Sequence, residues 1–142
     1  KHGLIMWIPF TILFLFAAFA LELMEGNKIT TTHYYGLRNV GLVILLFMSP
    51  FIFITHPISY FPLTIIIGNF LNHLMARIIT YTSVGGLIGV WFFNKMYGFN
   101  EGLYIQEYDL NVLSAIVIFG AAGFIYALID NYIFHRFIHK NP

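Results

Sequence analysis

The chain contains four long stretches without a formally charged side chain. Asp, Glu, Lys and Arg are absent from residues 3–21, 39–76, 78–94 and 110–129, which are 19, 38, 17 and 20 residues long. A helix that crosses the hydrocarbon core of a bilayer needs about 20 consecutive apolar residues. The first, third and fourth stretches each match one such helix, whereas the second is too long for a single crossing.

The composition of the whole chain agrees with this pattern. Of the 142 residues, 59% are hydrophobic and 9% are charged, whereas soluble domains carry roughly 25% charged residues. A soluble core of this size cannot bury so much apolar surface, so the expected partner is a lipid bilayer. The net charge of +1 gives no indication of nucleic acid as a partner. The sequence has no cysteine, which excludes a disulfide framework and a thiolate metal site.

We predict an all-α integral membrane protein, a four-helix bundle in one transmembrane domain over residues 1–142. The expected spans are residues 3–24, 37–55, 77–96 and 111–134. Helices and closed barrels are the two structures that satisfy their backbone in lipid, and the alternation typical of barrel strands is absent. The first span is read as retained, because no small-x-small cleavage site follows it.

Turn-forming residues indicate where the spans end. Pro50 and the stretch "THPISYFP" predict the end of the second span, because two prolines five residues apart resist a continuous helix. The stretches "EGNKITTTHYYG" and "YGFNEGLYIQEYD" are polar and contain glycines, so both are expected to be loops.

The stretch "IIIGNFLNHLMARIITYTS" places polar residues inside an otherwise apolar run. At helical spacing these residues fall on one side of a helix, opposite large apolar side chains. Intramembrane polar residues are candidates for function by default. The members of this polar face are Asn69, Asn72, His73, Arg77 and Thr80.

Two placements of the helical segment before the third span remain open. Residues 62–76 form either an amphipathic helix on the membrane surface or a segment sunk into the bundle, whose amides bond across helices. The spacing of the residues does not separate these alternatives.

Glycines within the third and fourth spans predict close helix packing. Gly85 and Gly89 are separated by three residues, and Gly120 and Gly123 lie on the fourth span. Small residues at such spacing allow the backbones of two helices to approach each other. The pattern concerns packing and carries no information about chemistry.

Charges at the ends of the spans predict three ion pairs at matching depths. Arg77 and Asp130 belong to one membrane edge and are expected to form a charge pair. At the opposite edge the same argument pairs Glu22 with Arg38, and Lys95 with Asp109. The edge with Arg77 also carries more basic residues, which favours cytoplasmic termini and a multi-pass protein of the cell membrane. These further basic residues are Lys1, Arg136 and Lys140.

Catalytic and metal-binding patterns are absent from the sequence. It contains no Gly-x-Ser-x-Gly, no His-Glu-x-x-His and no pair of acids within a span. His135 and His139 are four residues apart and share a helix face, but no third ligand is visible nearby. We therefore expect no enzyme, no cofactor and no metal site.

Two short stretches resemble known proteins. "ALIDNYIFHRF" looks like the ending of small uncharacterised four-span membrane proteins of Bacillus-type bacteria, which implies a bacterial membrane protein and no particular activity. "FFNKMYGF", residues 92–99, resembles the signature that follows a span in the GtrA-like flippase family. That resemblance implies four spans and transport of a lipid-linked sugar. In that family the signature recurs after two further spans, whereas here "YIFHRFIH" follows the next span.

Two functions follow from these observations. The first is a small non-enzymatic membrane protein that acts through helix–helix contacts, as an accessory, scaffold or immunity subunit or as a homo-oligomer. The alternative is a small transporter, flippase or channel that uses the polar face between Asn69 and Arg77.

Overall fold

The computed structural model describes residues 1–70 and 73–137. All its regular elements in these ranges are helical, and the part of the chain that the structure describes contains no strand. The helices are α1 (His2–Ile5), α2 (Trp7–Met24), α3 (Leu37–Val40), α4 (Ile44–Ile58), α5 (Tyr60–Phe70), α6 (Leu74–Tyr97), α7 (Phe99–Glu107) and α8 (Val112–Phe137).

Four helical stretches are long and apolar enough to cross a membrane. They confirm the predicted all-α, four-span fold of a multi-pass membrane protein, and their large exposed apolar side chains indicate contact with lipid. The four stretches are His2–Lys28, Leu37–Phe70, Leu74–Tyr97 and Val112–Phe137.

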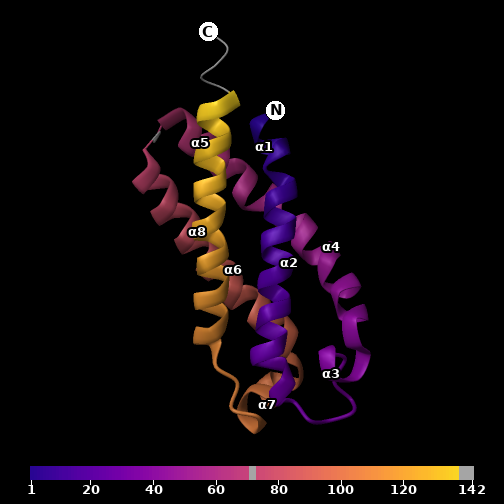
Figure 1. Cartoon of the computed structure of the whole chain (residues 1–142). Coiled ribbons are helices and arrows are strands. Elements are labelled where there is room, and N and C mark those ends of the chain that lie inside the picture. Colours follow the sequence, from indigo (N-terminus) through magenta and orange to yellow (C-terminus); the bar gives the residue numbers. More distant parts are fainter. Residues whose placement is uncertain (71–72, 138–142) are drawn as a thin grey trace.

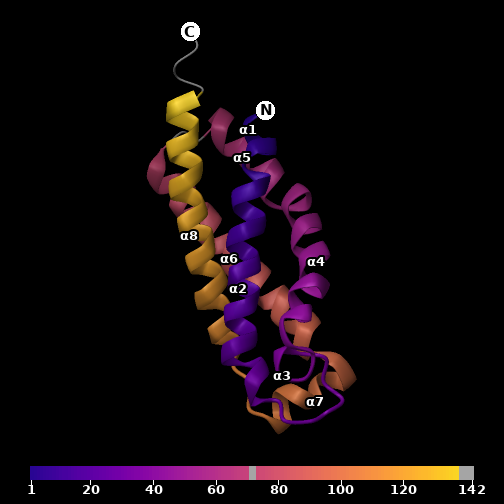
Figure 2. The ribbon, with the colours of Figure 1, turned by 45° about the vertical axis from the view of Figure 1, so that its right-hand side comes forward.

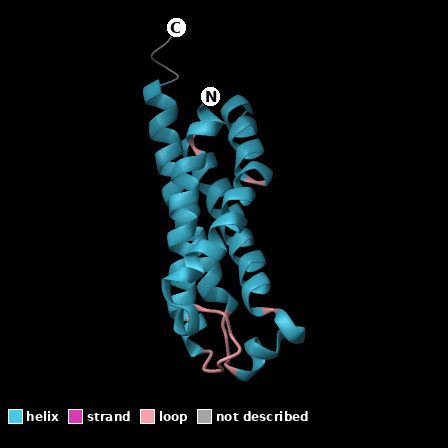
Figure 3. Cartoon of the chain, turned by 90° about the vertical axis from the view of Figure 1, so that its right-hand side faces the viewer, coloured by secondary structure: helices cyan, strands magenta, loops and turns pink. Residues whose placement is uncertain are grey.

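The long helices run side by side along one axis (Figure 1). α6 and α8 make the most extensive contact, and α2 packs against both α8 and α4. Figure 2 shows α2 between α8 and α4, so that α4 forms one side of the bundle. α1 and the last turns of α8 lie at one end, and most of the loop residues lie at the other end, with α7 (Figure 3).

The helix of the second span continues through both of its prolines, which lie inside α4. It is therefore longer than the sequence predicted. Proline removes a backbone N–H and so leaves the carbonyl four residues earlier without its helical donor. The Leu46 carbonyl, freed by Pro50, accepts a hydrogen bond from Ser49 Oγ at 3.1 Å. The Phe53 carbonyl, freed by Pro57, accepts one from a tryptophan side chain of α2. The helix therefore does not stop at residue 55, where the prolines predict the end of the span: α4 continues to Ile58, and α5 follows directly.

The helix that was predicted over residues 62–76 has different bounds. α5 ends at Phe70, and His73 has an extended backbone, with φ −103° and ψ 139°, before α6 begins. α5 buries Thr64 and Ile67 against the bundle and leaves its other face exposed.

The expected loop after the third span also contains a helix. α7 covers Phe99–Glu107, and Glu101 and Gly102 within it have positive φ angles of 60° and 77°. Tyr104 and Ile105 of this helix pack against the buried core. This apolar contact stabilises helical structure in a stretch whose local composition favours a loop.

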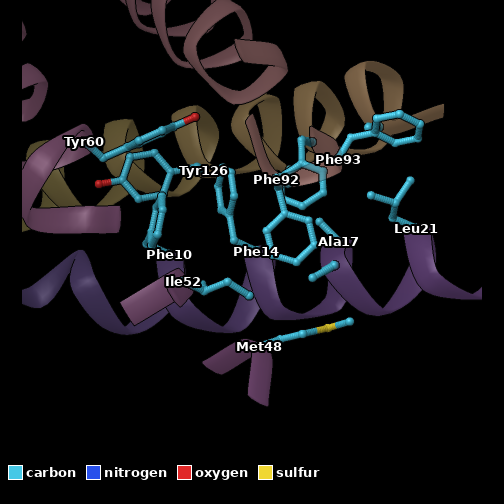
Figure 4. Packing of buried hydrophobic residues seen from close by; sticks show 14 of the residues in the cluster. Phe10, Phe14, Ala17, Leu21, Met48, Ile52, Tyr60, Phe92, Phe93 and Tyr126 are labelled. Atoms are coloured by element: carbon cyan, nitrogen blue, oxygen red, sulfur yellow. The ribbon is translucent and has the colours of Figure 1, made fainter. Parts of the chain in front are cut away.

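The core of the bundle is aromatic. Phe10 and Phe14, one turn apart on α2, stack with ring centroids 4.2 Å apart. Three further ring pairs extend this stack. The ring centroids are 4.9 Å apart for Tyr60 and Phe10, 4.7 Å for Tyr126 and Tyr60, and 5.7 Å for Phe119 and Phe14. Figure 4 shows the rings of Phe10, Phe14, Tyr60 and Tyr126 between α2 and the neighbouring helices. Ring pairs at such distances each contribute about 1 kcal/mol beyond their buried area.

Candidate functional site

Two buried charges of opposite sign lie between α6 and α8, near the end that holds α1. Arg77 and Asp130 are both fully buried, and Arg77 Nη1 donates a hydrogen bond to Asp130 Oδ2. His2 Nε2 lies 2.6 Å from the other carboxylate oxygen. The Arg77 guanidinium lies over the Phe134 ring, 4.5 Å from its centroid. The structure thus brings Arg77 and Asp130 together and adds a third helix, α1, to their contact.

A series of hydroxyl groups continues from this cluster towards the middle of the bundle. The Tyr81 hydroxyl lies 3.4 Å from Asp130 Oδ2 and 3.1 Å from Thr64 Oγ1. Thr64 Oγ1 also lies 3.4 Å from the Tyr126 hydroxyl and donates to the Tyr60 carbonyl at 2.8 Å. Tyr60 donates in turn to the Tyr81 carbonyl at 2.6 Å. These bonds connect α5, α6 and α8 through groups that are all buried.

The predicted polar face is divided between two helices. Asn69 is exposed on α5, and His73 is exposed at the start of α6. Arg77 points into the bundle, and Thr80 is half-buried. Asn72 lies outside the described residues. The face was derived for one continuous helix, and this premise is wrong because the backbone is extended at His73.

Two of the predicted packing glycines are required by the contact of α6 with α8. A Cβ atom at Gly85 would lie 2.5 Å from the Phe119 carbonyl oxygen. A Cβ atom at Gly89 would lie 2.5 Å from the Ala115 carbonyl oxygen. Real Cβ atoms do not approach backbone this closely, so these positions hold the two helices in contact only as glycine.

The two glycines of α8 differ in their surroundings. A Cβ atom at Gly123 would collide with the Tyr81 carbonyl oxygen. A Cβ atom at Gly120 would lie 3.8 Å from the nearest atoms of Thr82, which is ordinary van der Waals contact. Gly120 therefore has room for a methyl group that Gly123 lacks.

At the opposite end of the bundle, Glu22 is held by neutral donors. Its side chain is buried and accepts hydrogen bonds from the Tyr34 hydroxyl at 2.6 Å and the Tyr97 hydroxyl at 2.7 Å. The Leu37 N–H lies 3.3 Å from the same carboxylate. The predicted pair of Glu22 with Arg38 is wrong, because Arg38 is exposed and tyrosines surround the carboxylate. Burial and the adjacent Glu22 charge raise the pKa of Tyr34 well above its usual range, so its hydroxyl remains a donor.

The third predicted pair is also wrong. Lys95 and Asp109 are both exposed, and no ion pair joins them in the described ranges. Glu25 provides the charged contact at this end instead. It binds Lys28 Nζ at 2.9 Å, the Ser114 hydroxyl at 2.6 Å and a backbone N–H at the start of α8 at 3.0 Å. A carboxylate at this position is favourable because the first N–H groups of a helix have no intrahelical acceptor.

Beside the Glu22 cluster lies a cavity of about 650 Å³. It is bordered by α4 on one side, by the end of α6 and by α7 on another, and by the loop before α3. Tyr34 belongs both to this wall and to the Glu22 cluster. The lining residues are His33, Tyr34, Tyr35, Ile44, Phe47, Met48, Phe51, Met96, Phe99 and Tyr104.

A buried histidine on α4 has a different environment. His56 is fully buried, and its ring lies 5.6 Å from Trp7 and 5.0 Å from Phe10 between centroids. Neither ring nitrogen has a hydrogen-bond partner within the described part of the chain. An imidazole in such surroundings packs as an aromatic ring, at a cost for its unpaired nitrogens.

The histidine pair considered for metal binding is placed only in part. His135 is exposed on α8, and His139 lies outside the described residues. Among the residues that the structure describes, no three side chains of His, Asp, Glu or Cys gather in a way that could hold a metal ion.

Sequence reasoning missed the Glu22 cluster and the cavity. A signal for the cluster was present, since Glu22 and Tyr97 lie at ends of spans that must meet at one membrane edge. The cavity had no comparable signal, because its lining residues come from α4, α6, α7 and the loop before α3, which are brought together only in three dimensions.

No protein-family model, curated protein or solved structure matches the chain.

Proposed function

We propose that this protein acts by contact within the membrane, as an accessory subunit of a membrane complex or as a homo-oligomer. The observation that supports this proposal most is that the buried charged side chains bind groups of the same chain. Arg77, Asp130, Glu22 and Glu25 each contact other groups of the same chain. Such closed contacts rigidify a bundle, and they leave its outer surface as the part available for a partner.

The alternative of a transporter or channel has less support. Its path was expected along the face from Asn69 to Arg77, and these residues belong to separate helices. Arg77 is fully buried against Asp130 and Phe134, so its charge is already engaged. A polar path needs side chains that face water, and neither charged residue of this cluster does.

The face that we favour for the contact is the furrow between α2 and α4. Trp7, Ile8, Thr11 and Ile12 lie at helical spacing on one side of α2, and Phe53 of α4 borders them. This furrow has a volume of about 310 Å³. The Thr11 hydroxyl donates to the Trp7 carbonyl of its own helix at 2.9 Å and can still accept a hydrogen bond from a partner helix.

Cysteine crosslinking in native membranes tests this proposal, because the chain contains no cysteine. A single cysteine at Ile12, which is 51% exposed in the furrow, should give one discrete product with a thiol-reactive crosslinker. The matched control is Val117 on the outer face of α8, which is 69% exposed. A product of twice the mass identifies a second copy, and any other discrete mass identifies a partner.

The proposal fails if both positions give the same pattern, or if neither gives a discrete product while the purified protein is monomeric. Flux of ions through liposomes that contain the purified protein would favour the alternative.

We further propose that both termini face the cytoplasm, as the basic residues Lys1 and Arg136 favour. α1 and the end of α8 lie at the same end of the bundle (Figure 1), which supports a common side. Reporter fusions at each terminus test this, and opposite locations of the two reporters would contradict it.

A further inference from the structure

The cavity beside the Glu22 cluster has one long apolar wall and a border that contains hydrogen-bonding groups. Ile44, Phe47, Met48 and Phe51 line it from α4 at positions i, i+3, i+4 and i+7, so they form one face of that helix. At a rise of about 1.5 Å per residue, this wall runs about 10 Å along α4 from its first turn.

The cavity is open towards lipid and closed towards the interior. Phe47 and Phe51 are 61% and 58% exposed, and they belong to a span whose outer surface faces the bilayer. On the inner side, Met48 is 1% exposed and Tyr34 is 6% exposed. Because Tyr34 is bonded to Glu22, this inner wall is held in place before any ligand enters.

The size of the cavity selects among possible occupants. Its volume of about 650 Å³ lies within the range of about 300–1,000 Å³ in which proteins bind small molecules. A transmembrane helix is about 10 Å wide and about 30 Å long and so occupies about 2,000 Å³, several times more than the cavity offers. A single flexible hydrocarbon chain needs neither that width nor that length.

The chemistry of the border favours a molecule with a polar group at one end. His33 and Tyr35 are both exposed where the loop meets the cavity, and Tyr104 of α7 lies on its wall. Histidine and tyrosine provide hydrogen bonds at the level of lipid headgroups, where an aromatic ring and a polar group are accommodated together. Deeper in the cavity, the lining contributed by α4 and by Met96 offers apolar surface.

We propose that this cavity binds one phospholipid of the surrounding bilayer. One acyl chain lies along α4 between Met48 and Met96, and the headgroup is at His33 and Tyr35. The site is distinct from the furrow between α2 and α4, and the inference does not rest on the proposed contact function.

Photolabelling tests this site directly. The full chain is reconstituted in liposomes that contain a small fraction of phosphatidylcholine with a diazirine at the end of one acyl chain. After irradiation, the labelled residues are identified by mass spectrometry. We expect labelling to concentrate on residues 44–51 and on Met96, to saturate at one lipid per chain, and to decrease when unlabelled phosphatidylcholine is added.

A matched pair of variants separates the site from general lipid contact. Met96→Trp places an indole in the cavity and should reduce labelling of residues 44–51 by about tenfold, because an overfilled site excludes the chain. Met75→Trp makes the same exchange on the same helix at a position that is 70% exposed and outside the cavity. This control should leave the labelling unchanged.

Even labelling of all lipid-facing segments without saturation would overturn the proposal, since the cavity would then contain bulk lipid. An equal effect of Met75→Trp, or a crosslink from residues 44–51 to another protein, would overturn it as well. The labelling pattern of the unsubstituted protein tests the lipid site by itself, so the result does not depend on whether the Met96→Trp variant assembles. Cysteine crosslinking at Ile12 does not involve this cavity, so the two proposals can fail separately.

Discussion

The Trp7 indole of α2 donates a hydrogen bond of 2.9 Å to the Phe53 carbonyl oxygen of α4. That carbonyl has no helical donor because the residue four positions later is Pro57. The rings of Trp7 and Phe53 also stack, with centroids 4.5 Å apart. Trp7 of α2 thus satisfies the backbone carbonyl that Pro57 leaves without a helical donor. Such a group needs a partner within the protein, because the lipid core offers no hydrogen bonds.

Trp7→Phe should destabilise the protein by about 1 kcal/mol, because it leaves this acceptor without a donor. The free energy of unfolding in detergent measures the effect. Trp91→Phe is the control, since the Trp91 indole, 42% exposed, makes no hydrogen bond to any of the residues that the structure describes. Combining Trp7→Phe with Pro57→Ala should recover part of the loss, because alanine restores the helical N–H. No recovery in the double variant would show that the indole bond is not needed for that carbonyl.

Arg77→Gln and Asp130→Asn should each destabilise the protein by about 3 kcal/mol, because each removes the buried contact between the two opposite charges and leaves the other charge buried. The double change should cost less than the sum of the two, since neither charge remains. Thermal unfolding in detergent measures all three variants, and Arg38→Gln serves as an exposed control. Additive losses would mean that the two side chains do not act as a pair.

Gly85→Ala should weaken the protein by about 2 kcal/mol, because its new methyl group meets the Phe119 carbonyl oxygen and forces α6 away from α8. Gly120→Ala should have little effect, since the same methyl group has ordinary contacts there. Unfolding midpoints of the two variants provide the comparison. Equal losses would contradict the described contact of the helices.

Tyr97→Phe should cost about 2 kcal/mol, because a hydrogen bond to the buried Glu22 carboxylate is lost. The loop of residues 29–36 is anchored through the same carboxylate, so its cleavage by protease should also become faster. Tyr35→Phe is the control, since that side chain is 81% exposed. Unchanged cleavage in Tyr97→Phe would separate the loop from the cluster.

The number and type of the spans could be predicted from the sequence, because the spacing of charges follows directly from the thickness of a bilayer. The end of the second span could not, since Pro50 and Pro57 are accommodated by donors, Ser49 and Trp7, that are recognised only in three dimensions. Tertiary contacts outweighed the local signal of the prolines.

Charge pairing was predictable where both partners had little choice of neighbour, as for Arg77 and Asp130. At the opposite edge Glu22 had several possible donors, and a similar depth alone did not distinguish Arg38 from two tyrosines. The polar face from Asn69 to Arg77 depended on one unbroken helix, a premise that the extended backbone at His73 removes.

The contact of Arg77 with Asp130 also bears on the order in which the protein is made. The two residues are 53 positions apart in the chain, so during synthesis the guanidinium of α6 emerges before its carboxylate exists. α6 is the least apolar of the four spans, and the Arg77 charge near its start makes its insertion alone less favourable. We therefore expect the third span to gain stability in the membrane when the fourth supplies this carboxylate, so that correct placement of α6 depends on the later synthesis of α8.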